Sequence, residues 1–312
     1  MDVTLDGVTF SRDGRVVLDI GELSFPAGST TAVFGPNGSG KTTLLRCIAG
    51  LEHPTRGTVR VGGEQVRRGD PRIAIAFQQP VFLQGTVGQN LELGLELRGV
   101  PAASRGPRVA SIARECRIEG LLDRPARALS AGESQRVSLA RTLLLAAPVT
   151  LLDEPLSGFD RVSWLHMLEE IPALLSTRAA TTVVVTHDRE EAFRLAERIV
   201  ILVEGRVRAS GNTAAIYRAP PDAETAELLG YTLVEAEGRV IGFAPGSLTR
   251  EPTPLRFRLE AGRVVDLGNQ RRVIGRIGAT RVELALLPGE SAPIPGSWID
   301  VGPADWVEFG GG

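Results

Sequence analysis

The sequence predicts an α/β fold with a mostly parallel sheet, followed by a small all-β domain. Up to about residue 230, short apolar runs alternate with helical patterns, and strands that alternate with helices form parallel sheets covered on both faces. A glycine-rich loop, Gly35–Thr42, joins one of these strands to a helix. After about residue 230, Gly, Pro and short alternating runs dominate without a long helical pattern. We therefore expect two domains, 1–230 and 231–312.

The individual elements follow from the period of the apolar residues. Alternation predicts strands, a recurrence every three to four residues predicts helices, and short, fully apolar runs predict buried strands. In chain order, the first domain is expected to contain a strand at 2–10, short strands within 16–34, a helix after the glycine loop, strands at 57–62 and 72–77, a mostly helical stretch at 86–147 interrupted near 99–107, a strand at 149–153, a helix at 160–176, a strand at 181–185, a helix at 188–197 and a hairpin at 199–210. In the second domain, strands are expected at 263–267, 273–277, 281–287 and 298–301.

Composition excludes several classes of protein. A net charge of −2 argues against non-specific nucleic-acid binding, which needs a basic face, so no nucleic-acid partner is expected. No stretch approaches the roughly 18–20 apolar residues of a membrane span, and the acidic, alternating N-terminus predicts a strand and not a signal peptide. Cys47 and Cys116 lack metal-ligand spacing and are interpreted as ordinary thiols of a reducing, cytoplasmic compartment.

Lys41 is the only lysine among the 35 basic residues of the chain. It lies in a stretch that fits the phosphate-loop pattern G-x-x-x-x-G-K-[ST], after an apolar strand and at the start of a helix. Backbone N–H groups of such a loop surround a phosphate, the lysine reaches the β and γ phosphates, and the following hydroxyl binds Mg²⁺. The predicted nucleotide-binding residues are Gly35, Pro36, Asn37, Gly38, Ser39, Gly40, Lys41, Thr42 and Thr43.

Two acids end the buried strand at 149–153. Asp153 is the candidate for holding Mg²⁺, and Glu154 is the candidate general base that polarises an attacking water. Many strands end in acids, so these two residues indicate a nucleotide site only in combination with the phosphate loop that precedes them.

With these motifs, the sequence resembles the ATP-binding cassette (ABC) ATPases over about residues 2–230. Leu129–Val137, LSAGESQRV, resembles the family signature and lies just upstream of the acidic strand end. Gln78 resembles the Q-loop glutamine, Leu156–Asp160 the D-loop, and His187 the H-loop switch histidine, all in the family's order. The resemblance implies a helical subdomain at about 84–147.

The resemblance implies a head-to-tail homodimer in which each ATP lies between the phosphate loop of one copy and the signature of the other. Ser130 and Gly132 would contact the γ-phosphate across that interface, helped by the helix N-terminus, and Asp160 would link the two sites.

Within one copy, the resemblance implies that Glu154 activates water while His187 holds the γ-phosphate and the water. Gln78 would sense Mg²⁺, and Thr42 and Asp153 would also bind that ion.

Three positions depart from the family pattern. Arg12 stands where the family often has an aromatic residue that stacks on adenine; a guanidinium can also stack, and Phe10 is an alternative that fits the core better. Ala131 replaces a signature glycine and is expected to be tolerated. Glu133 replaces the signature glutamine and places a carboxylate near the partner's nucleotide, where repulsion would weaken closure on ATP.

The chain has one cassette and no membrane span, so the resemblance implies a separate permease, and in the same system an extracytoplasmic solute-binding protein. The cassette would lie at the cytoplasmic face of the cell membrane as a peripheral subunit. Phe82, Leu83 and Val87 are expected either to form an apolar groove for a permease helix or to pack inside the helical subdomain.

The tail and the cargo are less defined. Val240–Leu248 loosely resembles the C-terminal transport-associated OB (TOBE) domain of importer cassettes, an OB-like barrel that would support dimers, bind a regulatory anion or simply pack. The stretches QPVFL and GLELRGVP resemble cassettes that import oxyanions such as molybdate or tungstate. The alternative function is that of a soluble ABC ATPase acting on nucleic acid or ribonucleoprotein.

Overall fold

A computed structural model of the chain describes residues 1–236, 238–268 and 270–310. By their internal packing, the residues form two compact units, Met1–Ala214 and Ala215–Gly312. The sequence pattern placed the change of character later, after about residue 230. The stretch between holds two short helices, α7 (Thr213–Arg218) and α8 (Ala223–Leu228), and α8 packs on the first strands of the second unit.

The first unit begins with an antiparallel four-stranded sheet. Its strands, in spatial order, are β2 (Arg15–Phe25), β1 (Val3–Arg12), β4 (Arg56–Val61) and β5 (Glu64–Gln65). Asp13 and Gly14 both have positive φ, 49° and 77°, and form the tight turn between β1 and β2. One alternating face of β1 and β2 is buried, as the sequence predicts.

A six-stranded sheet forms the centre of the first unit, and its parallel strands confirm the predicted α/β class. In spatial order the strands are β10 (Arg206–Asn212), β9 (Arg198–Val203), β3 (Thr30–Phe34), β8 (Thr181–Thr186), β7 (Val149–Asp153) and β6 (Ile73–Ala76). Only the β9–β10 pair, the predicted hairpin at 199–210, is antiparallel.

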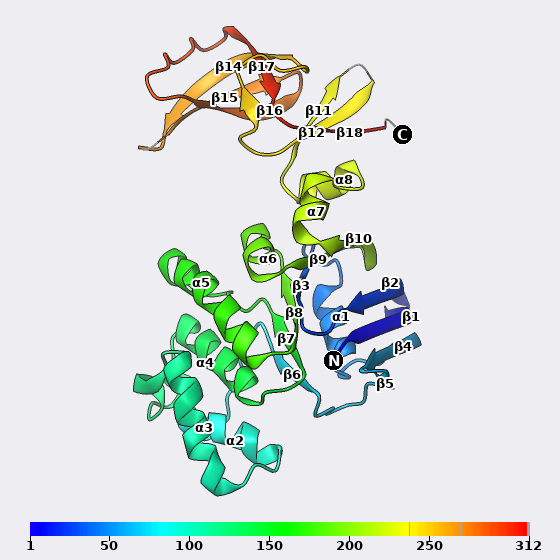
Figure 1. Cartoon of the computed structure of the whole chain (residues 1–312), viewed down its shortest axis with the longest axis vertical. Helices are drawn as coiled ribbons and strands as arrows, with labels where there is room; N and C mark the ends of the chain where they lie inside the picture. The colour runs from blue at the N-terminus through cyan, green and yellow to red at the C-terminus, as the bar shows by residue number, and fades with distance from the viewer. Residues whose placement is uncertain (237, 269, 311–312) are drawn as a thin grey trace. The chain divides into compact units, whose positions relative to one another are not determined.

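Both faces of this sheet are covered, which explains why β7 and β8 are apolar without alternation. Leu151 and Val183 pack with α1 (Lys41–Ile48) on one face. Their neighbours Leu152 and Val184 pack with the helices on the other face. Figure 1 shows α1 on one side of these strands and a group of helices on the other.

The helical part of the first unit lies between β6 and β7. It comprises α2 (Val87–Leu97), α3 (Ala102–Glu115), the 3₁₀ turns η1 (Glu119–Leu121) and η2 (Ala126–Ala128), and α4 (Ala131–Leu144). The expected interruption near 99–107 is shorter than predicted, because α3 continues through Pro107. Two further helices follow the sheet strands, α5 (Arg161–Arg178) and α6 (Arg189–Leu195).

A buried ion pair fixes the chain just before β6. The Asp70 carboxylate accepts hydrogen bonds from Arg72, with 2.6 Å between Asp70 Oδ2 and Arg72 Nη2, and Arg72 Nη1 also donates to the carbonyl of Val61 on β4. The side-chain hydrogen bond from Arg72 lowers the pKa of Asp70 to about 2. The pair therefore ties the central sheet to the antiparallel sheet.

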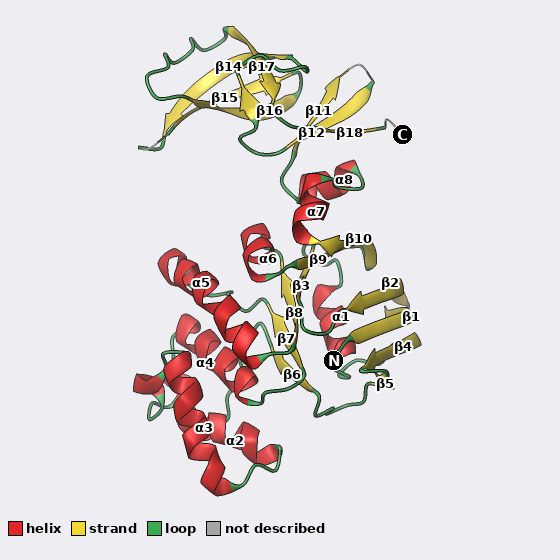
Figure 2. Ribbon diagram, in the orientation of Figure 1, coloured by secondary structure: helices red, strands yellow, loops and turns green. Residues whose placement is uncertain are grey.

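The second unit is built from antiparallel strands beyond α8 (Figure 2). A three-stranded sheet contains β11 (Thr232–Ala236), β12 (Arg239–Phe243) and β18 (Val307–Phe309). A five-stranded sheet contains, in spatial order, β13 (Leu248–Thr249), β17 (Trp298–Pro303), β14 (Phe257–Asp266), β15 (Arg271–Ile277) and β16 (Thr280–Leu286). Because its edge strands β13 and β16 also lie close together, this sheet curls into a nearly closed barrel, which fits the predicted OB-like class.

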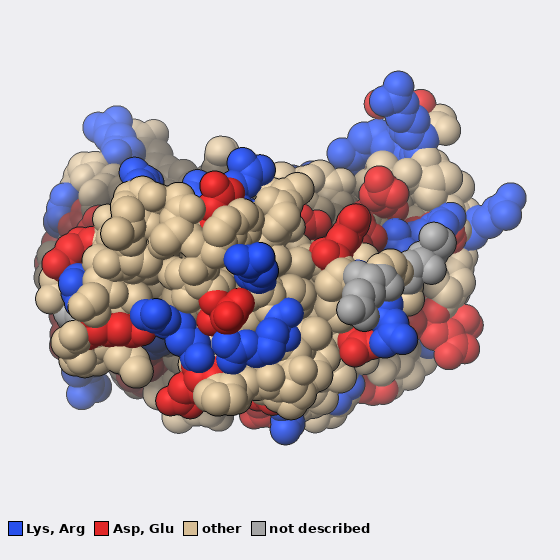
Figure 3. All heavy atoms as spheres, turned by 90° about the horizontal axis from the view of Figure 1, so that it is seen from above, with Lys and Arg blue, Asp and Glu red and all other residues tan. Residues whose placement is uncertain are grey.

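On the face shown in Figure 3, acidic and basic side chains are interspersed among a larger uncharged surface. Neither sign of charge forms a continuous stripe on that face. Such mixed charge lacks the focused positive potential by which a protein captures a nucleic-acid backbone.

Candidate functional site

The glycine-rich loop turns sharply between β3 and α1, and two of its glycines have no substitute. A Cβ on Gly35 would lie 2.0 Å from the backbone oxygen of Leu202. Gly40 has a φ of 101°, and a Cβ there would meet Leu18 Cδ2 at 2.8 Å. The loop therefore keeps this path only with glycine at both positions.

The N-terminus of α1 is open to an anion. No side chain caps the helix at Gly40, and its first turn contains no acidic residue. The first backbone N–H groups of a helix have no partner within the helix, and they carry its partial positive charge. Together with the loop N–H groups, they form a candidate phosphate cradle.

Lys41 is held inside this cradle. Its side chain is 5% exposed, and Nζ donates to the carbonyls of Gly35 at 2.8 Å and Pro36 at 2.9 Å. Burial lowers the pKa of Lys41, and the nearby carboxylates of Glu154 and Asp153 oppose that shift. An ammonium has three N–H donors, so one remains for a phosphate oxygen.

Thr42 and Asp153 meet as the sequence predicts for a magnesium site. Thr42 Oγ1 donates to Asp153 Oδ1 at 3.2 Å, and Asp153 is 3% exposed at the end of β7. Burial raises the pKa of Asp153, while the hydrogen bond from Thr42 and the charges of Arg46 and Lys41 oppose that shift. A hydroxyl and a carboxylate oxygen are ligands that Mg²⁺ prefers, and the fit of these residues to that ion is good.

Glu154 receives two side chains from distant parts of the chain. Gln78 Nε2 donates to its Oε2 at 2.8 Å, and His187 Nδ1 lies 2.9 Å from its Oε1. Glu154 itself has a positive φ of 45°, and its backbone N–H donates to the carbonyl of Val185 on β8. All three predicted catalytic residues therefore meet at the carboxyl ends of neighbouring strands.

A cavity of about 450 Å³ brings these groups together. Its lining consists of Val17, Asn37, Gly38, Gly40, Lys41, Thr42, Thr43, Gln78, Glu154 and His187. Of these, Val17 is absent from the predicted site, because alternation places it only as a strand residue. A long-range contact puts it here, since the carbonyl of Val17 lies 3.1 Å from the Cβ position of Gly40.

Arg12, the candidate for stacking on adenine, contacts two neighbouring side chains. Its Nη2 pairs with Glu52 Oε1 at 3.0 Å, and its guanidinium lies 5.6 Å from the ring centre of buried Phe10. Arg12 is absent from the cavity lining, whereas Val17 belongs to it.

The comparisons with known proteins decide the family. The ABC transporter profile matches residues 18–157. The chain is 37% identical over 247 residues to the Fe(3+) ions import ATP-binding protein FbpC of Streptomyces coelicolor, covering 78% of this chain and 70% of that protein. The chain belongs to the ABC transporter ATP-binding family. It is an ABC ATPase of the importer type, as the sequence motifs predict.

Other relatives are named for the import of different solutes. The sulfate/thiosulfate import ATP-binding protein CysA of Thermosynechococcus vestitus is 38% identical over 234 residues, which cover 74% of this chain and 70% of that protein. The sn-glycerol-3-phosphate import ATP-binding protein UgpC 2 of Agrobacterium fabrum is 38% identical over 213 residues, covering 67% and 57%.

Solved structures agree with the fold of the first unit. An ATP-binding subunit of an ABC transporter aligns with a TM-score of 0.63 at 28% identity, covering 70% of this chain and 92% of that one. The protein cbiO1 of Clostridium perfringens aligns with a TM-score of 0.63 at 25% identity, covering 70% and 90%.

The ABC signature lies outside the cavity, at the exposed start of α4. Ser130 caps this helix in a reciprocal arrangement with Glu133: Glu133 N donates to Ser130 Oγ at 3.3 Å, and Ser130 N donates to Glu133 Oε2 at 2.8 Å. Gly132 lies in the same turn, where a Cβ would be 3.2 Å from the ring of Phe159.

The carboxylate of Glu133 has a cationic partner. Arg124 Nη1 donates to Glu133 Oε1 at 2.7 Å. The hydrogen bond from the Ser130 backbone N–H, supported by Arg124, holds the pKa of Glu133 below its usual value. The charge that was expected to repel the partner's nucleotide is therefore compensated within the chain.

One buried residue of the signature helix links three motifs, and its role could not be predicted from sequence alone. Gln135 Nε2 donates to the backbone carbonyl of Gln78 at 2.5 Å and to Ser157 Oγ at 3.0 Å. These bonds join α4 to the Q-loop and the D-loop. Asp160 of the D-loop caps α5, accepting from Val162 N at 3.0 Å and Ser163 N at 3.1 Å.

The candidate permease-facing residues divide between surface and core. Leu83 is 61% exposed, whereas Val87 is fully buried among the helices. Phe82 is partly buried, with the guanidinium of Arg141 4.9 Å from its ring centre. Leu83 and Phe82 line a hollow of about 730 Å³ on the helical subdomain.

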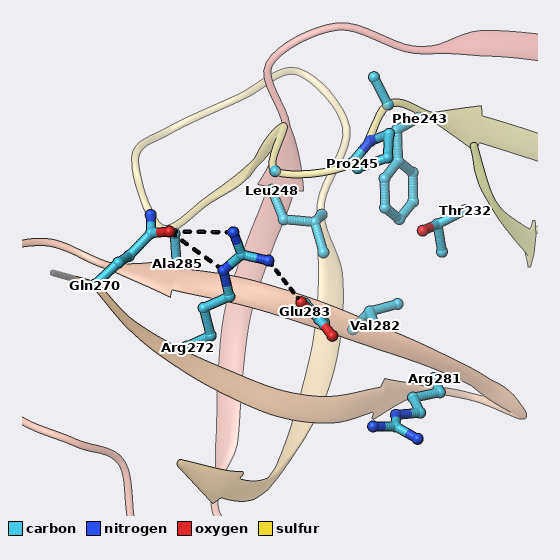
Figure 4. A pocket seen from close by; sticks show the side chains of 12 residues that line it. Thr232, Phe243, Pro245, Leu248, Gln270, Arg272, Arg281, Val282, Glu283 and Ala285 are labelled. Atoms are coloured by element: carbon cyan, nitrogen blue, oxygen red, sulfur yellow. Dashed lines mark hydrogen bonds and ion pairs between the residues drawn. The ribbon is translucent and has the colours of Figure 1, made fainter. Parts of the chain in front are cut away.

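The second unit has a hollow of a different chemistry, of about 350 Å³ (Figure 4). Phe243, Pro245 and Leu248 form its apolar wall. Arg272 lies at its floor but is engaged by Glu283 at 3.0 Å and Gln270 at 3.2 Å. The anion-sensing role of the tail stays a prediction.

Among the residues that the structure describes, no helix is both long and apolar enough to cross a membrane. Both cysteines, Cys47 and Cys116, are free and buried, and burial raises the pKa of each to about 12. Such thiols stay protonated and unreactive at neutral pH.

Proposed function

We propose that this ABC ATPase hydrolyses Mg²⁺-bound ATP at a composite site between two copies of the chain and thereby powers solute import through a separate permease. One observation carries the proposal: Gln78 and His187 meet at Glu154 in the cavity that also contains Lys41 and Thr42. The cavity thus gathers a candidate base, its positioning groups and a phosphate cradle.

The magnesium ion would be held by Thr42 Oγ1, by Asp153 directly or through water, and by Gln78 as the sensor of the loaded site. When bound, the ion neutralises charge on the β and γ phosphates. Among the described residues, no cluster of three or more His, Cys, Asp or Glu side chains forms a metal cage, which fits an ion that also relies on phosphate oxygens.

Glu154 acts as the general base. Its carboxylate accepts a proton from the water that attacks the γ-phosphorus, while the bond to the β–γ bridging oxygen breaks and ADP leaves. His187 orients that water and the γ-phosphate, and Lys41 stabilises the charge on the phosphate oxygens. Val17 supplies an apolar wall for the adenine ring, because it lines the cavity whereas Arg12 is paired with Glu52.

The other half of the site comes from a second copy. Ser130, Gly132 and Glu133 lie outside the cavity of their own chain, at an exposed helix start that suits the γ-phosphate of a partner. Asp160 links the two sites across the interface. Capping by Ser130 and compensation by Arg124 prepare this helix start for an anion.

The permease docks on the hollow that Leu83 lines, and a solute-binding protein delivers cargo from outside the membrane. This places the cassette at the cytoplasmic face of the membrane as a peripheral subunit. The relatives named for sulfate, glycerol-3-phosphate and iron import favour a small charged solute, and an oxyanion matches two of these three.

Size-exclusion chromatography of the Glu154→Gln variant tests the composite site. With ATP and Mg²⁺, the variant is expected to elute as a dimer and to retain bound ATP, because binding persists while hydrolysis is lost by about a hundredfold or more. A variant that hydrolyses ATP at the unaltered rate would refute the general-base role.

Docking is tested by co-purification with the permease from the same genomic neighbourhood. Leu83→Asp is expected to abolish co-purification, whereas Leu97→Asp, at a site 78% exposed on the same subdomain, is the matched control and should retain it. ATPase stimulation by nucleic acid, without any association with a permease, would contradict the importer proposal.

A further inference from the structure

A buried carboxylate outside the cavity lining is used by none of the motifs described so far. Glu191, on α6, is 5% exposed. It accepts a hydrogen bond from Trp164 Nε1 at 2.8 Å and another from Thr186 Oγ1 at 2.7 Å. Both donors are neutral, and among the described residues no basic side chain forms an ion pair with Glu191. A carboxylate without a countercharge is costly to bury, so its position calls for a reason beyond packing.

One end of this bridge fixes the residue next to the switch histidine. Thr186 ends β8 and directly precedes His187. Its Oγ1 donates to Glu191 and also accepts from the backbone N–H of Asp188 at 2.9 Å. The chain is therefore anchored on both sides of His187, whose Nδ1 lies 2.9 Å from Glu154 Oε1.

The other end of the bridge reaches the helix that starts at the D-loop. Trp164 lies in the first turn of α5, and its backbone N–H donates to the carbonyl of Asp160 at 2.8 Å. The ring of Trp164 is buried, which leaves its Nε1–H dependent on Glu191 for a partner.

We propose that Glu191 is a positioning residue that holds His187 in register with Glu154 and couples it to the start of α5 at Asp160. The inference rests on the proposed role of His187 in hydrolysis. Since Trp164, Glu191 and Thr186 form one continuous set of hydrogen bonds, a shift of the D-loop helix displaces the turn that carries His187. Contact of a second copy at Asp160 is thereby transmitted to the hydrolytic centre of the same chain.

A neighbouring contact separates this role from simple helix packing. At the surface, Arg161 pairs with Glu190 at 3.2 Å, and its guanidinium lies 4.3 Å from the ring centre of Trp164. This pair also joins α5 to α6, but it has no bond to Thr186. Glu190 is thus a matched control for Glu191, adjacent in sequence and on the same helix.

The test compares steady-state ATPase kinetics and thermal unfolding of Glu191→Ala, Glu191→Gln and Glu190→Ala, with His187→Ala as the reference. Glu191→Ala is expected to lower kcat at least tenfold while the Kd for ATP changes less than about twofold. Glu191→Gln should restore most of kcat, because its amide can accept from Trp164 Nε1 and donate to Thr186 Oγ1. Glu190→Ala should retain the unaltered kcat.

Adding His187→Ala to Glu191→Ala should slow hydrolysis no further than His187→Ala alone, since both act through one group. If Glu191→Ala fails to fold, Trp164→Phe replaces it, because phenylalanine removes the Nε1 donor and keeps an aromatic ring.

Three results overturn the inference, and a fourth distinguishes it from the proposed function. A lowered Tm with unchanged kcat in Glu191→Ala makes the bridge purely structural, and an unchanged kcat in Trp164→Phe does the same. An inactive His187→Ala beside a fully active Glu191→Ala rejects the positioning role alone. A fully active His187→Ala instead rejects the proposed role of the histidine itself.

Discussion

Replacing Lys41 by arginine tests why the chain has a single lysine. The substitution keeps the positive charge but exchanges a compact ammonium for a longer, planar guanidinium. In the structure, Lys41 Nζ lies 2.8 Å from the carbonyl of Gly35 and 2.9 Å from that of Pro36. A guanidinium has no room at that point without moving the loop, because the side chain is only 5% exposed.

The size of the effect follows from the bonds at stake. The third N–H of the ammonium is the one available to a phosphate, and a hydrogen bond between charged groups contributes about 1.5–3 kcal/mol. Since each 1.4 kcal/mol is tenfold, Lys41→Arg should raise the Kd for ATP roughly 10- to 100-fold. Loss of a donor to the charge that develops in the transition state should lower kcat by about a hundredfold or more.

The assay uses the absence of other lysines. An amine-directed reagent can modify Lys41 and the α-amino group, so mass spectrometry resolves both positions in one experiment. Mg²⁺ and ATP should slow modification of Lys41 while the α-amino group serves as the internal reference. Calorimetry then gives the Kd for ATP of the wild type and of Lys41→Arg.

An arginine variant that binds and hydrolyses ATP as the wild type does would refute this reasoning. The single lysine would then reflect chance in a composition rich in arginine. Modification of Lys41 at a rate independent of ATP would contradict its place beside the phosphates in the same way.

Three further predictions follow from individual contacts. Arg124→Ala should raise the ATP concentration needed for dimer formation about two- to fivefold, because a half-exposed ion pair contributes less than about 1 kcal/mol. Arg124→Lys should recover part of this loss. An unchanged midpoint of dimer formation in light scattering would exclude a role of Arg124 in closure on ATP. Asp70→Asn should lose about 2 kcal/mol of stability at pH 7, because the pKa of Asp70 is about 2 against an ordinary 3.8. The wild type should lose this contribution as the pH falls from about 5 toward 2. If denaturant titrations gave the free energy of unfolding the same pH dependence in the wild type and the variant, that result would contradict the prediction. Arg12→Ala should leave the Kd for ATP unchanged, whereas Val17→Asp should raise it at least tenfold. If fluorescence titrations showed a raised Kd only for Arg12→Ala, the adenine would stack on Arg12 instead.

The glycine loop was predictable because its chemistry depends on neighbours in sequence. Gly35 and Gly40 form a turn, Lys41 and Thr42 follow at the helix start, and this local spacing alone specifies a phosphate cradle. The strand ending in Asp153 was equally clear, since a fully buried strand reads as a continuous apolar run.

Contacts between distant segments were beyond the reach of local patterns. The position of Val17 in the cavity depends on the approach of β2 to Gly40. The compensation of Glu133 by Arg124 joins a loop to a helix start, and the ion pair of Arg12 with Glu52 joins the end of β1 to the loop after α1. Charge and alternation along one strand contain no information about such partners.

The sequence by itself determined the α/β class and the ABC ATPase family, and it named the candidate phosphate-binding and acidic residues, because these depend on short motifs and on the period of apolar residues. The tertiary structure decided what surrounds them. It brought Gln78 and His187 to Glu154, left the signature at Ser130 outside its own cavity, and connected Glu191 to the switch. The physical reason is that a parallel sheet places the ends of strands far apart in sequence side by side, and only that register sets which side chains meet.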